Sequence, residues 1–239
     1  MRARLVDMPV QTAARVAGLL YLIIIAGGLF AEGAVRDQLI VAGDAAATAR
    51  NILDHALLYR LGFAVHLFYL SCALALAIIL YDMFRRVSSN LALLALCFDV
   101  VSIAIEAANL LNQFAPLRLL TDEGLAGLEP SQLHAMAYAY VRLFASGFGL
   151  SLVFFGFFCI ATGTLIYRSG FLPRALGILM AVAGICYLVN SFAVFVLPDL
   201  ATHLFPYILL PCLIGELSLA LWLLIKGIRV DRFEAWSGT

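Results

Sequence analysis

The chain has 239 residues, of which 64% are hydrophobic and 13% are charged, and its formal net charge is zero. A soluble domain is roughly 45–50% apolar and about 25% charged, and a globule of this size could not cover so much apolar surface. The composition therefore excludes a soluble globular protein, a disordered chain and a disulfide-rich scaffold, and it indicates a multi-pass helical membrane protein.

Six apolar stretches are long enough to cross a membrane, for which a helix needs about 20 residues. Polar backbone groups in lipid must be paired within their own segment, which makes helices the default, and the alternating pattern of an outer-membrane barrel is absent. The sequence predicts an all-α integral membrane bundle of six transmembrane helices. The expected spans are Ala13–Ala31, Ala56–Tyr81, Leu91–Phe114, Leu143–Tyr167, Ala175–Leu197 and Phe205–Lys226. This divides the chain into an N-terminus (1–12), one transmembrane domain (13–228) and a C-terminal tail (229–239).

Two connections between the spans are short and two are long. Arg85–Asn90 and Arg168–Pro173 are tight turns, the second with a glycine to end one helix and a proline to open the next. In the two long connections, Glu32–His55 and Ala115–Arg142, we expect short helices that lie at the membrane interface. Asp44 is the predicted N-cap of the first, and the second is expected to begin around Glu129-Pro130-Ser131. Small-residue pairs such as Gly177 and Ala181 predict close packing between spans.

The basic residues predict the orientation, because cytoplasmic loops carry an excess of Lys and Arg. Ten basic residues fall on the side of the termini and five on the side of the long connections, which predicts that both termini are cytoplasmic. The first set is Arg2, Arg4, Arg15, Arg85, Arg86, Arg168, Arg174, Lys226, Arg229 and Arg232, and the second is Arg36, Arg50, Arg60, Arg118 and Arg142. No basic run indicates nucleic-acid binding.

Ionisable residues inside the spans are the candidates for function, because each costs about 2.5–3.5 kcal/mol on insertion scales and therefore faces the interior of a bundle. The predicted intramembrane polar site consists of His66, Asp99, Glu106, Asn109, Asn190 and Glu216. Two arginines near the outer ends of the helices, Arg60 and Arg142, are the expected partners of Glu106.

Counting about 1.5 Å per residue from the cytoplasmic helix ends sorts these residues into two layers. Asp99 and Glu216 fall about 12–14 Å deep, where two close carboxylates would share a proton. The second layer, about 22 Å deep, holds His66, Glu106 and Asn190. Asp99 and Glu106 are seven residues apart and so lie on one face of their helix.

Familiar catalytic and metal-binding signatures are absent from the sequence. The five cysteines lie in apolar spans without a CxxC pair, the four histidines have no i, i+4 spacing, and there is no HExxH, GxSxG or phosphate-binding loop. We therefore expect no metal and no cofactor, and the sequence leans away from an enzyme.

Three short motifs carry a resemblance: Gly43-Asp44-Ala45, Leu172-Pro173-Arg174 with Gly177, and Gly215-Glu216-Leu217-Ser218. With their flanking spans, over about residues 13–228, they resemble the bacterial family of multi-pass membrane proteins called domain of unknown function 4386. The resemblance implies the inner membrane of a bacterial cell and a six-span topology. It implies no mechanism, because the family has no established activity.

Three hypotheses for function follow. The first is proton- or cation-linked transport of a small solute through the acidic site, which makes a small molecule the ligand and the lipid bilayer the surroundings. The second is a membrane-embedded enzyme that acts on a lipid-soluble substrate, which requires an opening from the outer polar layer. The third is a non-catalytic subunit or scaffold whose interfacial segments dock an unknown protein partner.

Overall fold

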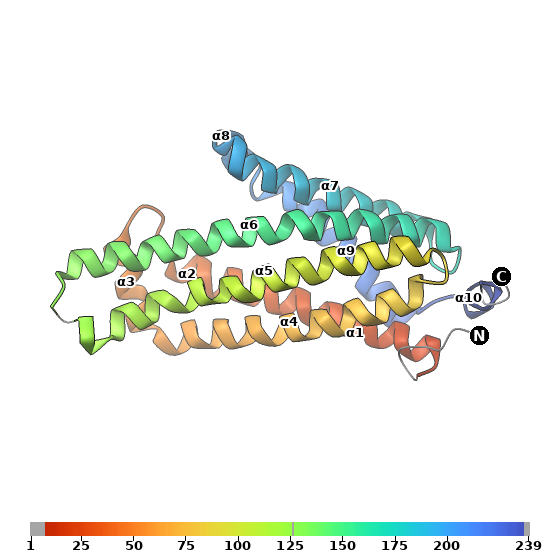
Figure 1. Cartoon of the computed structure of the whole chain (residues 1–239), viewed down its shortest axis with the longest axis horizontal. Helices are drawn as coiled ribbons and strands as arrows, with labels where there is room; N and C mark the ends of the chain where they lie inside the picture. The colour runs from red at the N-terminus through yellow and green to blue at the C-terminus, as the bar shows by residue number, and fades with distance from the viewer. Residues whose placement is uncertain (1–7, 126, 237–239) are drawn as a thin grey trace. The chain divides into compact units, whose positions relative to one another are not determined.

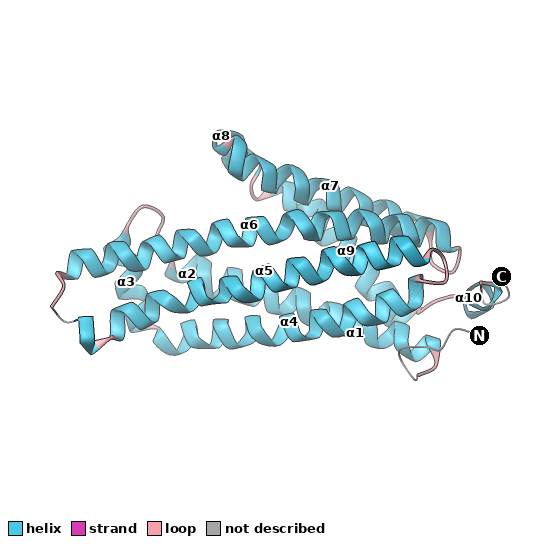
Figure 2. Cartoon of the chain, in the orientation of Figure 1, coloured by secondary structure: helices cyan, strands magenta, loops and turns pink. Residues whose placement is uncertain are grey.

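The computed structural model describes residues 8–125 and 127–236, and these are helical almost throughout (Figures 1 and 2). Six helices are long and apolar enough to cross a membrane, as the sequence predicted. The first seven residues of the predicted cytoplasmic N-terminus and the last three of the tail lie outside the described residues. The α-helices are α1 (Val10–Leu29), α2 (Asp37–Leu39), α3 (Ala45–Asp54), α4 (Ala56–Phe84), α5 (Ser89–Thr121), α6 (Pro130–Ser169), α7 (Arg174–Val196), α8 (Pro198–Leu204), α9 (Leu210–Ile225) and α10 (Val230–Ala235). A π-helix (Phe30–Arg36) joins α1 to α2, and short 3-10 turns occur at Glu123–Leu125 and Tyr207–Leu209.

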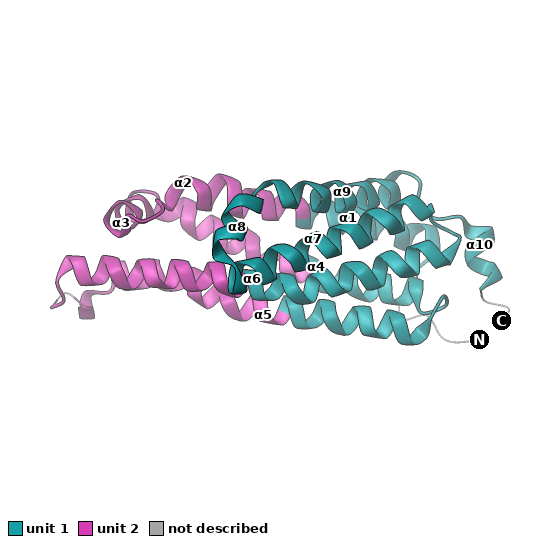
Figure 3. Ribbon diagram, turned by 90° about the horizontal axis from the view of Figure 1, so that it is seen from above, with its two compact units in different colours: residues 1–24, 72–103, 149–239 teal, residues 25–71, 104–148 magenta. Residues whose placement is uncertain are grey.

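The chain forms two compact units, which Figure 3 distinguishes by colour. Unit 1 contains residues 1–24, 72–103 and 149–239, and unit 2 contains residues 25–71 and 104–148. Both units therefore draw on α1, α4, α5 and α6, whereas α7 and α9 belong to unit 1 alone.

Within unit 1, glycines let α6 and α7 approach until their backbones touch. A Cβ atom built on Gly163 would lie 2.6 Å from the carbonyl oxygen of Gly177, and one built on Gly177 would lie 2.6 Å from that of Gly163. The turn between the helices contains Gly170 with a φ of +70°, which ends α6 in the left-handed conformation that glycine adopts without strain. The sequence predicted both the turn and the close packing at Gly177.

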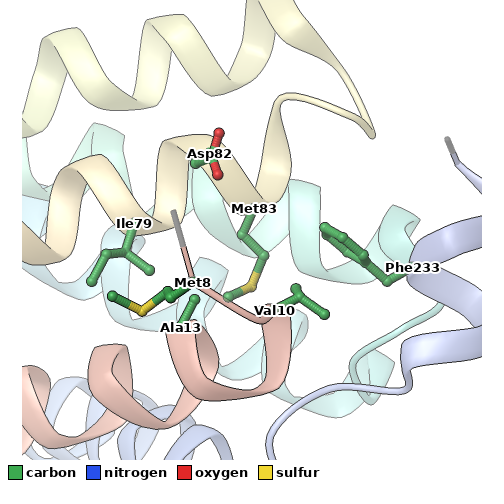
Figure 4. Close-up of a pocket in the computed structure, with 7 residues that line it drawn as sticks. All are labelled: Met8, Val10, Ala13, Ile79, Asp82, Met83 and Phe233. Carbon is green, nitrogen blue, oxygen red and sulfur yellow. The ribbon is translucent and has the colours of Figure 1, made fainter. Parts of the chain in front are cut away.

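The C-terminal tail forms a short helix that is tied to the ends of other helices in unit 1. The amide of Gln11 donates to the carbonyl oxygen of Lys226 at 2.9 Å and accepts from the backbone N–H of Ile228 at 3.1 Å. In α10, Phe233 packs edge-on against Phe171 at 5.4 Å, and the Trp236 indole donates to the carbonyl oxygen of Ser169 at 2.9 Å. A cavity of about 10 Å³ borders Phe233 of this helix. Its lining residues, drawn in Figure 4, are Met8, Val10, Ala13, Ile79, Asp82, Met83 and Phe233.

Unit 2 has a hydrophobic core of its own, formed by Val35, Leu39, Ile52, Tyr59 and Leu117. Helix α3 contributes Ile52 to it and begins where the sequence predicted, because Asp44 caps the helix by accepting from the N–H of Ala47 at 2.8 Å. The N–H of Gly43 donates to the Tyr138 hydroxyl at 2.7 Å, which anchors the turn before α3 to α6.

The second long connection is shorter than expected. A helix begins at Pro130, as predicted, but it is the long helix α6 itself; α5 continues to Thr121, and only residues 122–129, with the 3-10 turn Glu123–Leu125, connect the two. Helix α6 has 40 residues and is therefore about 60 Å long, twice the thickness of the hydrocarbon region. Hydropathy marks the part of a helix that crosses lipid, and it does not mark the helix ends.

Candidate functional site

A buried histidine, tyrosine and glutamate form a closed hydrogen-bonded triangle in unit 2. His66 and Tyr69 lie one turn apart on α4, and Glu106 faces them from α5. The His66 Nε2 atom lies 2.7 Å from Glu106 Oε1 and 2.5 Å from the Tyr69 hydroxyl oxygen, and that hydroxyl donates to Glu106 Oε1 at 2.7 Å. His66 is 1% exposed and Glu106 is 9% exposed. Two residues of the predicted site, His66 and Glu106, are thus in direct contact.

The hydrogen on Nε2 depends on the state of Glu106. If Glu106 is ionised, its carboxylate can only accept hydrogen bonds, and Nε2 then carries the hydrogen that points toward it. The other ring nitrogen, Nδ1, is buried and has no hydrogen-bond partner among the described residues. In that tautomer the neutral imidazole carries its hydrogen on Nε2, and a second proton on His66 sits on Nδ1.

Two charged residues of the π-helix border the triangle. Glu32 interacts electrostatically with both His66 and Glu106, and its carboxylate accepts from the Arg36 guanidinium at 3.3 Å. The Arg36 guanidinium lies 5.1 Å from the centroid of the Phe144 ring, which itself meets His66 edge-on at 5.9 Å. Sequence reasoning placed Glu32 and Arg36 in a connection and missed them. The available signal was an acid four residues before a base, directly after an apolar run.

A stripe of amides on α5 continues from Glu106. Asn109 donates to the carbonyl oxygen of Phe144 at 2.8 Å and accepts from Asn112 at 2.9 Å, so its side chain joins α5 to α6. One turn further on, the Tyr59 hydroxyl donates to the backbone carbonyl of Gln113. The Gln113 Oε1 atom is buried without a hydrogen-bond partner among the described residues. It borders a cavity of about 20 Å³, space for roughly one water molecule, lined by Val35, Arg36, Ile40, Tyr59, Gln113, Val141 and Phe144.

A second buried carboxylate, Glu216 on α9, belongs to unit 1. The Tyr187 hydroxyl on α7 donates to its Oε1 atom at 2.5 Å. Tyr21 on α1 lies within electrostatic range of both Glu216 and Asp99, although its hydroxyl completes no well-formed hydrogen bond with a described residue. Asp99 and Glu216, which the sequence placed at one depth, are therefore each within electrostatic range of the Tyr21 phenol, and Glu216 is hydrogen-bonded to Tyr187.

The remaining predicted residues lie as follows. Asn190 belongs to unit 1, and its Oδ1 atom is buried without a hydrogen-bond partner among the described residues. Arg60 and Arg142 are exposed, and the hydrogen bonds of Glu106 come from His66 and Tyr69. Tyr69, Tyr187 and Tyr21 were missed as polar partners, because the sequence treats an aromatic residue in an apolar span as a packing residue.

Comparisons with known proteins place the chain in a wider context. The sequence model of the family described as "Domain of unknown function (DUF4386)" matches residues 16–227. An uncharacterized protein of Archaeoglobus fulgidus is 27% identical over 155 residues, which cover 65% of this chain and 76% of that relative. No solved structure matches the chain. Both polar networks, from Tyr21 to Glu216, fall inside the range that the family model matches.

Proposed function

We propose that this chain, which belongs to the DUF4386 family of polytopic membrane proteins, couples the movement of a small solute across the membrane to a proton held by His66. The observation that carries the proposal is the orientation of the buried imidazole. Its Nε2 atom is fixed by Glu106 and Tyr69, and its Nδ1 atom has no partner among the described residues. Ionisable groups inside membrane spans typically mark proton relays and substrate pathways.

The charge of the His66–Glu106 pair changes by one unit with the proton on Nδ1. The protonated pair, an imidazolium beside a carboxylate, is neutral overall, and the deprotonated pair carries a net charge of −1. A buried negative charge is costly in the membrane, so a small cation or a solute with hydrogen-bond donors would be favoured there when the proton has left. Proton and solute would thus compete for one site, which is the basis of coupling.

Two acids in unit 1, Glu216 and Asp99, form a second site that binds a proton in this proposal. Glu216 is 7% exposed and Asp99 is 5% exposed, and each lies within electrostatic range of the Tyr21 phenol. We propose that the two acids with Tyr21 and Tyr187 form a separate proton-binding station. This predicts that Glu216→Gln and Asp99→Asn each abolish transport while the protein still folds.

For the membrane arrangement, we propose cytoplasmic termini, location in the inner membrane of a bacterial cell, and α3 at the opposite interface. The support is the distribution of ten basic residues on the terminal side against five on the other. Helix α3 is short, and three of its ten residues are buried.

Two alternatives are less well supported by the geometry near His66. An enzyme acting on a lipid-soluble substrate needs an opening at the polar groups, but the cavity beside Gln113 holds about 20 Å³, far less than a lipid requires. A non-catalytic subunit does not need a histidine with a fixed Nε2 bond and a free Nδ1. Co-purification of a protein partner without any solute-dependent proton movement would favour the subunit.

The test is proton movement in vesicles that contain the purified protein and an internal pH indicator, with a potassium diffusion potential and a panel of small cations and polar solutes. The wild type should acidify or alkalinise the lumen in the presence of a solute, and both His66→Gln and Glu106→Gln should not. His55→Gln is the matched control, since His55 is exposed in the same unit. The proposal is wrong if both variants keep the wild-type flux, or if no solute raises the wild-type flux above that of protein-free vesicles.

A further inference from the structure

Glu32 lies in the π-helix Phe30–Arg36. Its wider turn is closed by the N–H of Asp37, which donates to the carbonyl oxygen of Glu32. Such segments cost backbone regularity and are frequent at functional sites. Glu32 and Arg36 lie four residues apart in it and form an ion pair at 3.3 Å.

The exposure of the side chains rises in steps from His66 to Glu32. The His66 side chain is 1% exposed, that of Glu106 is 12% exposed, and that of Glu32 is 37% exposed. Glu32 is thus the most exposed of the three side chains, and it lies within electrostatic range of the buried pair.

We propose that Glu32 passes protons between water and the Nδ1 atom of His66. The inference rests on the proposed function and adds the route by which its proton arrives and leaves. In the outward step, the Nδ1–H bond of the imidazolium breaks and a bond to a Glu32 carboxylate oxygen forms, directly or through one water molecule. His66 then keeps its Nε2–H bond to Glu106, and Glu32 releases the proton to water.

Arg36 also takes part in the proposed proton route, because it pairs with Glu32. Its guanidinium pairs with Glu32 and lies over Phe144, so a Glu32 that turns toward His66 must exchange one partner for another. The other charged groups that interact with Glu32 are Asp37 at the start of α2, His66 on α4 and Glu106 on α5.

The experiment follows proton uptake by the full-length protein in lipid nanodiscs after a rapid pH drop, with a soluble pH indicator. The part of the uptake that is missing in His66→Gln defines the His66 signal. We expect Glu32→Gln to slow this phase by at least roughly tenfold and to leave its amplitude intact, since the acceptor remains and only its route is removed. Glu32→Asp should restore part of the rate. The control is Asp54→Asn, which removes an exposed acid of the same unit.

The outcomes separate this inference from the proposed function. A wild-type rate in Glu32→Gln shows that protons take another route, and the role of His66 stands. Loss of amplitude in Glu32→Gln, in a variant with the wild-type melting temperature, makes Glu32 part of the binding site and overturns its role as a route. A wild-type protein without any His66-dependent uptake overturns both proposals.

Discussion

Replacing Gly177 with alanine should destabilise the crossing of α6 and α7 by an amount that the structure allows us to estimate. The new Cβ atom would lie 2.6 Å from the carbonyl oxygen of Gly163 and 2.7 Å from the backbone nitrogen of Tyr167. Ordinary contacts of a Cβ atom begin near 3.4 Å, so the helices must separate by about 0.8 Å. Both obstructing atoms are backbone atoms and cannot rotate away. Overpacking of this kind costs about 1–3 kcal/mol, which corresponds to a fall in melting temperature of roughly 2–12 °C.

The double variant Gly163→Ala, Gly177→Ala gives the sharper test. Each glycine faces the carbonyl oxygen of the other at 2.6 Å, so one separation of the helices relieves both clashes. The second substitution therefore adds little to the first, and the loss in the double variant should be clearly smaller than the losses of the two single variants together.

The assay is thermal unfolding of the detergent-solubilised protein at a fixed heating rate, because unfolding of membrane proteins is commonly irreversible. Gly28→Ala is the control, since a Cβ atom at this α1 position meets nothing within 4 Å. Alanine is the better helix former, so this variant should melt at the wild-type temperature or slightly above it. Unchanged melting of both single variants, or strictly additive losses in the double variant, would refute the reasoning.

Two further predictions concern segments outside the helix crossing. Asp44→Ala removes the cap of α3 and should lower the stability of the helix by about 1 kcal/mol, which hydrogen exchange over Ala45–Asp54 would show as faster exchange. Asp44→Asn keeps a capping side chain and should exchange like the wild type. Equal exchange in all three proteins would contradict the capping role. Gln11→Ala removes two hydrogen bonds to residues 226–228 and should speed hydrogen exchange in those residues and in α10. The exchange of α3 should not change. Unchanged exchange in α10 would show that the contacts of Trp236 and Phe233 are enough to hold this helix.

The number of spans could be predicted from the sequence, because about 20 apolar residues without charge have few stable alternatives to a membrane helix. The ends of the spans could not. The hydropathy of the first span falls at Ala31, yet the chain continues through the π-helix to Leu39, and α5 continues past Pro116 to Thr121. Beyond the lipid, tertiary packing decides the helix ends, as the core formed by Val35, Leu39 and Leu117 illustrates.

The contact between His66 and Glu106 could be predicted because depth along a straight helix depends only on residue count. The partners of Glu216 and Glu106 could not, since nothing in the sequence distinguishes Tyr69 and Tyr187 from packing tyrosines. Glu32 was missed because it lies beyond the apolar run of its span: its spacing to Arg36 signalled an ion pair, but nothing in the sequence signals the π-helix that carries both residues. The roles of Asp99, Asn190 and Glu216 stay predictions.

In the proposed function, the triangle of His66, Tyr69 and Glu106 changes its charge while its hydrogen bonds stay in place, because those bonds involve Nε2 and the exchanged proton sits on Nδ1. Because the triangle does not rearrange when its charge changes, the new charge changes the electrostatic forces on the charged groups nearby. Such groups on another element are Glu32, which interacts electrostatically with both His66 and Glu106, and its partner Arg36, and both lie in the π-helix. A proton can shift a conformational equilibrium only where its binding differs between the two states. For this chain, we therefore expect any conformational response to that proton in the π-helix, which lies between α1 and the capped helix α3.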